Sequence, residues 1–156
     1  MSQNFQNLQI WQDTINFHKA IASEISKFPK EEIYTMSSQL RRASLSISNN
    51  IAEGCGRESA KELRNFLNIA MGSCKEVENM IIVSKELSYI SDETYKTLIQ
   101  KIITIGKKLN SLMQKVSLSI NQKLKTKNQQ HKRSLFPPTN NQKLKTKNTG
   151  EACSPS

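Results

Sequence analysis

The stretch SSQLRRASLSISNNIAEGCGRESAKELRNFLNIAMG, residues 37–72, decides the fold of this chain. Its first half has apolar residues at helical spacing, and Gly54-Cys55-Gly56 predicts the end of that helix. Ser59-Ala-Lys-Glu62 is a capping box, which starts a second helix because each side chain satisfies a free backbone N–H of the other residue. We expect Gly54 or Gly56 to adopt the left-handed conformation that ends many helices. The stretch therefore predicts two long helices joined by a tight turn.

Residues 8–28 predict a helix that precedes this stretch, because their apolar side chains also recur at helical spacing. The expected core stripe consists of Trp11, Ile15, His18, Ala22 and Ile25. The apolar residues that flank this stripe are Ile10, Phe17, Ile21 and Phe28. His18 has no second metal ligand nearby, so we interpret it as a packed, hydrogen-bonded histidine. Pro29 ends the helix, because proline disfavours helical geometry in the residue before it.

The two helices of the opening stretch are expected over about residues 34–53 and 60–87. A fourth helix is predicted over about residues 91–118, with Ser91 as its capping residue. The expected core stripes of these three helices are Met36, Leu40, Ala43, Ile47 and Ile51; Leu63, Phe66, Leu67, Ala70, Cys74, Val77 and Ile81; and Tyr95, Leu98, Ile102, Ile105, Leu109, Leu112, Val116 and Ile120. Each helix has one broad apolar face and the connections are short. The sequence therefore predicts an all-α fold, an antiparallel up-down four-helix bundle.

The C-terminal region differs from the rest of the chain. The segment NQKLKTKN occurs at residues 121–128 and again at 141–148, and residues 121–156 have a net charge of +7 against +3 for residues 1–120. A segment with low hydrophobicity and high charge buries too little apolar surface to offset the conformational entropy that folding costs. We therefore expect a bundle over residues 1–118 and a disordered, Lys-rich tail over residues 119–156.

The outer faces of the second and third helices suggest an oligomer. Leu45 lies among small residues, including Ala52, and Gly72 points away from the expected core. A glycine costs a helix interior about 1 kcal/mol relative to alanine, and the close approach of another subunit would explain it. We therefore expect Leu45, Ala52 and Gly72 in a homo-oligomer interface. The alternative for Leu45 is a single exposed leucine that needs no explanation.

Basic side chains give a candidate nucleic-acid-binding surface, since basic tails favour polyanions. Lys101, Lys108 and Lys115 recur every seven residues on the flank of the fourth predicted helix. The full candidate set is Arg41, Arg42, Arg64, Lys101, Lys107, Lys108, Lys115, Lys123, Lys125 and Lys127. The alternative is a solvated lysine face without a ligand. The folded part has no obvious row of exposed aromatic residues, so we expect phosphate contacts rather than base stacking.

No catalytic, cofactor or metal site is predicted. The chain has no Gly-rich phosphate loop, no paired histidines and no nucleophile–base arrangement. Cys55 is a candidate nucleophile only if its neighbouring glycines form a reactive turn. We instead interpret Asn50, Glu53, Gly54, Gly56 and Arg57 as residues that build a structural turn, and we expect the protein not to be an enzyme.

Three cysteines without metal-like spacing give no disulfide framework. We find neither a signal-peptide pattern nor an apolar run of about 18 residues that would span a membrane. We therefore expect a cytoplasmic protein.

A set of short motifs along the second and third predicted helices carries a family resemblance. The motifs are Gln39-Leu-Arg-Arg-Ala43, Ser46-Ile47, Asn50-Ile-Ala-Glu-Gly54, Gly56-Arg57, Phe66-Leu67, Ile69-Ala70 and Gly72-Ser73. Through them the chain resembles the four-helix bundle proteins encoded in intervening sequences of 23S ribosomal RNA, over roughly residues 8–118. Ser48 departs from the family pattern, which commonly has proline there, and a serine keeps the backbone donor.

The resemblance implies a non-catalytic homo-oligomer. The family also resembles the accessory proteins of diversity-generating retroelements, which form basic, ring-shaped pentamers that bind reverse transcriptase and nucleic acid. A pentamer is therefore the favoured oligomer. Two functions stay open: an RNA-associated oligomer whose partner is rRNA or another nucleic acid, and a protein–protein adaptor whose partner is a reverse transcriptase.

Overall fold

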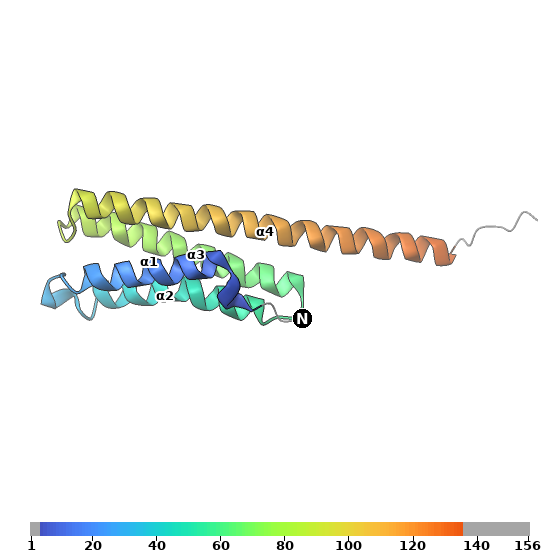
Figure 1. Cartoon of the computed structure of the whole chain (residues 1–156), viewed down its shortest axis with the longest axis horizontal. Coiled ribbons are helices and arrows are strands. Elements are labelled where there is room, and N and C mark those ends of the chain that lie inside the picture. The colour runs from blue at the N-terminus through green and yellow to red at the C-terminus, as the bar shows by residue number, and fades with distance from the viewer. Residues whose placement is uncertain (1–3, 136–156) are drawn as a thin grey trace, which may run out of the picture. The chain divides into compact units, whose positions relative to one another are not determined.

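The computed structural model describes residues 4–135, which form α-helices and short 3-10 helices with no strand among them (Figure 1). The elements in chain order are η1 (Phe5–Asn7), α1 (Gln9–Ile25), η2 (Lys30–Glu32), α2 (Met36–Cys55), α3 (Ala60–Glu86) and α4 (Asp92–Leu135). The predicted all-α, four-helix fold is confirmed.

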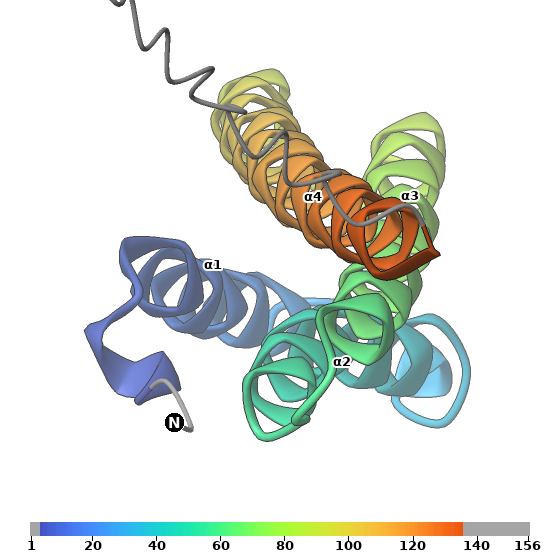
Figure 2. The same cartoon turned by 90° about the vertical axis from the view of Figure 1, so that its right-hand side faces the viewer.

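α1, α2, α3 and the part of α4 up to Lys123 belong to one compact unit, and the part of α4 from Leu124 to Leu135 belongs to a second unit. Figure 2 shows the helices of the first unit nearly end-on. Ser46 of α2 contacts Ser73 of α3 at 2.9 Å, while Gly54, later in α2, faces Leu63, earlier in α3. These contacts run in opposite directions along the two helices, as between antiparallel neighbours. The up-down order of all four helices stays a prediction.

The core stripes of α2, α3 and α4 largely follow the predicted residues. The fully buried members are Leu40, Ala43, Ile47 and Ile51 of α2; Leu67, Ala70, Cys74, Val77 and Ile81 of α3; and Leu98, Ile102, Ile105, Leu109 and Val116 of α4. The predicted stripe residues nearer the helix ends, such as Met36 and Leu63, are half-buried against this core. Helical periodicity therefore identified the buried faces of three helices.

The buried stripe of α1 is different from the predicted one. The residues that are fully buried are Ile10, Thr14, Phe17, Ile21 and Ile25, whereas Trp11, Ile15, His18 and Ala22 are half-buried. Ile25 belongs to both stripes, and Ile10, Phe17 and Ile21 were predicted as flanking residues, so within the wide apolar arc of α1 the buried stripe is rotated towards this flank. Thr14 fits this stripe because its hydroxyl donates to the Trp11 carbonyl oxygen at 2.6 Å, which satisfies the buried polar group.

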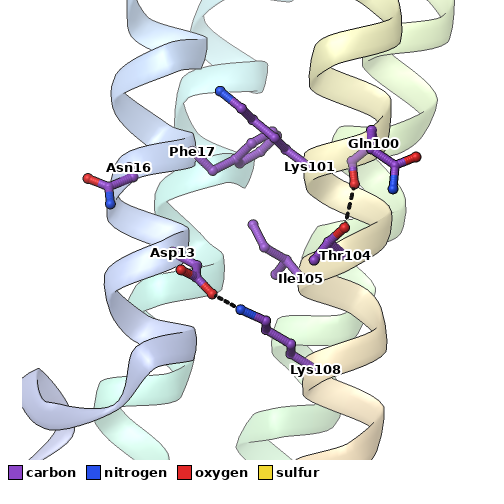
Figure 3. Close-up of a pocket in the computed structure, with 8 residues that line it drawn as sticks. All are labelled: Asp13, Asn16, Phe17, Gln100, Lys101, Thr104, Ile105 and Lys108. Carbon is purple, nitrogen blue, oxygen red and sulfur yellow. Dashed lines mark hydrogen bonds and ion pairs between the residues drawn. The ribbon is translucent and has the colours of Figure 1, made fainter.

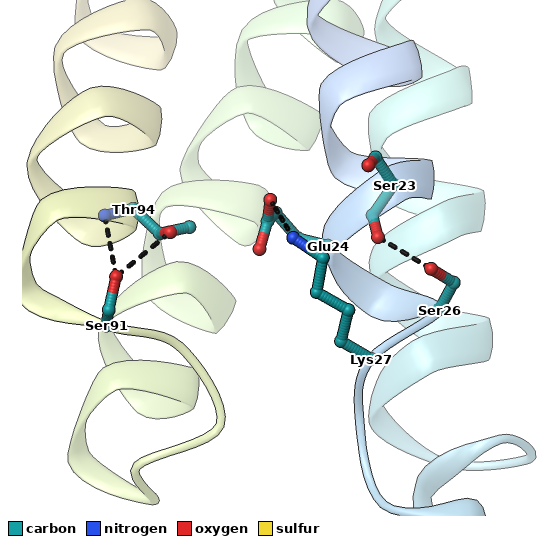
Figure 4. Close-up of polar contacts among 6 residues, drawn as sticks. All are labelled: Ser23, Glu24, Ser26, Lys27, Ser91 and Thr94. Carbon is teal, nitrogen blue, oxygen red and sulfur yellow. Dashed lines mark hydrogen bonds and ion pairs between the residues drawn. The ribbon is translucent and has the colours of Figure 1, made fainter.

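The helix caps follow the sequence at two of the turns. The backbone N–H of Glu62 donates to Ser59 Oγ at 3.1 Å, and that of Thr94 donates to Ser91 Oγ at 3.1 Å. Figure 4 shows Ser91 at the start of α4, together with the exposed Glu24–Lys27 ion pair at the end of α1. Both serines satisfy a backbone donor that the helix itself leaves free.

The prediction of a left-handed glycine between α2 and α3 is wrong. Gly56 has φ −77°, and among the described residues no glycine has a positive φ. Gly54 lies inside α2, and a Cβ atom there would lie 3.0 Å from both Leu63 Cδ1 and Phe66 Cβ. The close approach of α3 therefore leaves little room for a side chain at this position. Ser88, in the turn before α4, has the one positive φ of the described non-glycine residues, 58°.

The fourth helix does not end near residue 118 as predicted. α4 continues to Leu135 through the first NQKLKTKN segment, residues 121–128, whose side chains are all exposed. Lysine, glutamine and leucine have good intrinsic helix propensity, so this segment forms a helix without an apolar face to bury. The expected disordered tail therefore does not begin at residue 119. The second copy at 141–148 and Cys153 lie outside the described residues.

Candidate nucleic-acid interface

A groove between α1 and α4 brings together several of the candidate lysines (Figure 3). Its central hollow has a volume of about 280 Å³. The buried side chains of Phe17 and Ile105 form an apolar floor. The polar residues that line it are Asp13, Asn16, Gln100, Lys101, Thr104 and Lys108. The groove therefore combines an apolar floor with a rim of amide, hydroxyl and charged groups.

The same surface continues towards the start of α1. A second hollow, of about 390 Å³, shares Thr104 and Lys108 with the first and is also lined by Lys107 and Lys115. We call the two together the α1–α4 groove. Lys101, Lys108 and Lys115, which were predicted from their spacing, and the neighbouring candidate Lys107 all border it.

An ion pair crosses the α1–α4 groove. Lys108 Nζ lies 2.5 Å from Asp13 Oδ2, and Gln9 Nε2 donates to Asp13 Oδ1 at 3.0 Å. Burial raises the pKa of Asp13, but the hydrogen bonds from Lys108 and Gln9 and the lysine charge outweigh it, so the pKa lies below its usual value. Asp13 therefore stays ionised at neutral pH. Lys108, a candidate nucleic-acid-binding residue, is paired with this carboxylate.

The remaining candidate basic residues do not gather at this groove. Arg41 and Arg42 are exposed on α2, which contributes no residue to the groove lining. Arg64 of α3 is oriented by a hydrogen bond of 2.9 Å from its Nε to Ser117 Oγ of α4. Lys123 is exposed at the end of the first unit. Lys125 and Lys127 lie on the part of α4 that belongs to the second unit.

The charge of α4 is more one-sided than its lysine spacing indicated. The helix contains ten lysine and arginine residues, and its two acids, Asp92 and Glu93, both lie in the first turn. Asp92 is paired with Lys85 at 2.5 Å. From Thr94 to Leu135 the helix has no acidic residue. A count of acids along the predicted helix would have found this feature in the sequence.

The model of the 23S rRNA-intervening sequence protein family matches residues 6–111. The chain belongs to this family. It is also similar to a solved structure, a protein of unknown function from the S23 ribosomal protein family of Bacteroides thetaiotaomicron. The TM-score is 0.63 and the sequence identity 26%, over 67% of this chain and 95% of the other.

Family membership confirms the resemblance seen in the α2 and α3 motifs. The relation to accessory proteins of diversity-generating retroelements stays a prediction. A comparison with curated proteins found no match. Within residues 4–135, no helix has the combination of length and apolarity that crossing a membrane requires.

The candidate interface residues lie on the outer faces of α2 and α3. Leu45 is 40% exposed and borders a hollow of about 610 Å³ with Arg42, Asn49 and Glu76. A Cβ atom on Gly72 would have no neighbouring atom within 4 Å, so the glycine is not needed for packing within the subunit.

Two further residues extend this outer face. Ala52 is half-buried and borders a hollow of about 620 Å³ that Phe5 and Gly56 also line. Ile69, which was not among the predicted interface residues, is 52% exposed one turn before Gly72.

The polar residues of the predicted turn form two separate contacts. Arg57 pairs with Glu53 and lies 4.9 Å from the centre of the Phe66 ring. Asn50 instead donates to the Ser46 carbonyl oxygen at 2.8 Å, and Ser46 Oγ contacts Ser73 of α3. Both contacts fix α2 against α3, which supports a structural role.

Cys55 and Cys74 are buried, and His18 is half-buried between helices. Burial raises the pKa of the Cys55 thiol, and burial is also the main reason that the pKa of Cys74 is raised to about 12. A thiol that stays protonated is a poor nucleophile. The residues described by the structure contain no cluster of three or more histidine, cysteine or acidic side chains that would hold a metal ion. His18 Nδ1 lies 2.8 Å from Ser44 Oγ, the hydrogen-bonded arrangement that we expected.

Proposed function

We propose that this protein is a non-catalytic, homo-oligomeric RNA-binding protein that holds its ligand along α4. The observation that carries the proposal is the absence of acids from α4 after its first turn, against ten lysine and arginine residues. Such a helix presents a continuous positive field, which attracts a polyanion at long range. Membership of a family whose members are encoded with 23S rRNA makes RNA the first polyanion to test.

The mode of binding that we propose is contact with phosphates. After Tyr95, which is half-buried, α4 has no phenylalanine, tyrosine or tryptophan. Tyr34 is 90% exposed but lies between α1 and α2. Bases therefore have no stacking platform along the basic helix. Binding should be weakly sequence-specific and should weaken steeply with salt, with a log–log slope of about −0.7 for each phosphate neutralised on a single strand.

The experiment compares the full chain with a variant that ends at Lys123. The deletion removes seven of the 23 basic residues and leaves the first compact unit complete. We expect the truncated protein to keep its melting temperature, to bind a labelled poly-uridine strand more weakly, and to show a shallower salt slope. A full-length variant with Lys125, Lys127 and the second-copy lysines changed to glutamine is the control for chain length. Unchanged affinity and slope in both variants would confine binding to residues 1–123.

A second candidate function is that of a protein–protein adaptor, such as a reverse-transcriptase accessory protein. The exposed apolar residues Leu45 and Ile69 on α2 and α3 favour it, because they offer a contact surface that RNA does not need. The same binding experiment separates the two functions. If the full chain does not bind RNA even at low salt, the RNA-binding proposal is wrong and the adaptor is the better explanation.

A further inference from the structure

We propose that the α1–α4 groove is the path of the RNA backbone on the bundle, and that Asp13 limits the affinity by competing with phosphate for Lys108. This inference rests on the proposed function, which it deepens by assigning a site and a restraining residue. Among the described residues that line the groove, four are lysines and Asp13 is the sole acid. The charge of the groove therefore suits an anionic strand at all but one position.

The dimensions of the groove suit a short single strand. Lys101, Lys108 and Lys115 lie seven residues apart along α4, which corresponds to about 10.5 Å for each interval at 1.5 Å per residue. The three lysines therefore span about 21 Å, roughly six nucleotides at the ~3.4 Å rise of a stacked strand. Lys107 adds a fourth cation beside the second hollow. A strand in this groove would have several phosphates within reach of lysine.

The ion pair in the groove gives Asp13 its restraining role. Its Oδ2 atom is 2.5 Å from Lys108 Nζ, and the Gln9 side chain holds the other oxygen atom at 3.0 Å. A phosphate that binds Lys108 must displace this carboxylate or accept its repulsion, because both groups are anions competing for the same donor. The Asp13 side chain is 25% exposed, so solvent screens the pair only in part.

Asp13→Asn is the informative substitution. Asparagine keeps the size of the side chain and removes its charge, so Lys108 becomes available to phosphate. We expect the affinity for poly-uridine at low salt to rise roughly three- to fivefold, the scale of a partly exposed ion pair. We also expect the salt slope to steepen by about 0.7, the value for one additional phosphate contact.

The chain offers a closely matched control in Glu78→Gln. Glu78 is also 25% exposed and also paired with a lysine, Lys75, at 2.6 Å, but it lies on α3 and does not line the α1–α4 groove. Both substitutions change the net charge of the protein by the same amount. A gain of affinity for Asp13→Asn beyond that for Glu78→Gln therefore reports the groove and not the overall charge.

A double-variant test identifies Lys108 as the group that Asp13 restrains. In a Lys108→Gln background, Asp13→Asn should give no more affinity than Glu78→Gln does. Equal gains with and without Lys108 would overturn the restraint. The melting temperature of each variant shows whether the bundle is intact, and Lys101→Gln, which leaves the ion pair in place, should weaken binding in either background.

The outcomes separate this inference from the proposed function. If the unmodified chain binds RNA but Asp13→Asn equals Glu78→Gln, the groove assignment is wrong and the proposed function stands. If neither the unmodified chain nor Asp13→Asn binds RNA at low salt, both are wrong. If poly-glutamate of matched length shows the same gain with Asp13→Asn and competes equally with RNA, the groove is a site for acidic protein segments and the assignment to RNA is overturned.

Discussion

The Nδ1 atom of His18 on α1 lies 2.8 Å from the Oγ atom of Ser44 on α2. The Ser44 hydroxyl also donates to the Arg41 carbonyl oxygen at 3.0 Å. Since a serine hydroxyl has one hydrogen, it accepts from His18, and the neutral imidazole carries its hydrogen on Nδ1. Ser44 is fully buried, as are Thr14 and Ser48, whose hydroxyl groups donate to carbonyl oxygens of their own helices. The contact therefore ties α1 to α2 through polar groups that are satisfied inside the protein.

The stability of the bundle should depend on the protonation of His18. Burial, and then the nearby Arg41 charge, lower the pKa of His18 below its ordinary value of 6.5. The unfolded chain therefore binds more protons than the folded chain between the two pKa values, and stability falls as the pH decreases through that window. We expect the melting temperature to be constant above about pH 7 and to decrease towards pH 5.

The control for this pH dependence is His18→Gln, which removes the titrating group. The decrease between pH 7 and pH 5 should become shallower in this variant. An unchanged decrease would assign it to another group. The carboxylates with lowered pKa values, Asp13, Glu32 and Asp92, act in a different window, because the stability they contribute is lost only as the pH falls through their depressed values.

Gly54→Ala should destabilise the bundle although alanine is the better helix former. The new methyl group would lie 3.0 Å from atoms of Leu63 and Phe66, and overpacking of this kind costs about 1–3 kcal/mol. Gly106→Ala is the control, because its nearest neighbour would be Met71 Sδ at 3.9 Å. That variant should be stabilised by up to about 1 kcal/mol. Urea unfolding measures both, and equal effects would mean that the α2–α3 approach is not tight.

Ser88→Gly should stabilise the turn between α3 and α4. Ser88 has φ 58°, a conformation that costs an L-residue about 1–2 kcal/mol and costs glycine almost nothing. The larger entropy of the unfolded glycine chain offsets part of this gain, so we expect a net increase of about 0.5–1 kcal/mol. Ser88→Ala keeps the strain and should show no increase. A glycine variant no more stable than the alanine variant would contradict the assignment.

The proposed oligomer interface on the outer faces of α2 and α3 can be tested by measuring the mass of the protein in solution. If Leu45 and Gly72 face another subunit, light scattering after size exclusion should give several times the 17.7 kDa mass of one chain. Gly72→Leu or Leu45→Glu should then reduce this mass while the helical signal in circular dichroism stays unchanged. Leu118→Glu is the control, because Leu118 is 61% exposed on α4, outside the proposed interface. A monomeric parent protein at micromolar concentration would exclude the oligomer.

Most of the helices of this protein could be predicted from its sequence, although the end of α4 could not. Apolar residues such as Leu40, Ile47 and Ile51 recur at the period of the α-helix, and Ser59 and Ser91 cap helices through hydrogen bonds to residues three positions away. These interactions are local in the chain, so they can be read without knowing which helices are neighbours. The family motifs of α2 and α3 lie in the same local stretch, and they led to the correct family.

The tertiary structure decided what depends on residues far apart in the sequence. The close approach of α3 leaves little room for a side chain at Gly54, and the packing of α1 selects Thr14 and Phe17 over Trp11 and Ile15 within a wide apolar arc. The pairing of Asp13 with Lys108 joins residues 95 positions apart. Helical periodicity gives the face of a helix, but the neighbour that this face meets follows from the packing of the whole bundle.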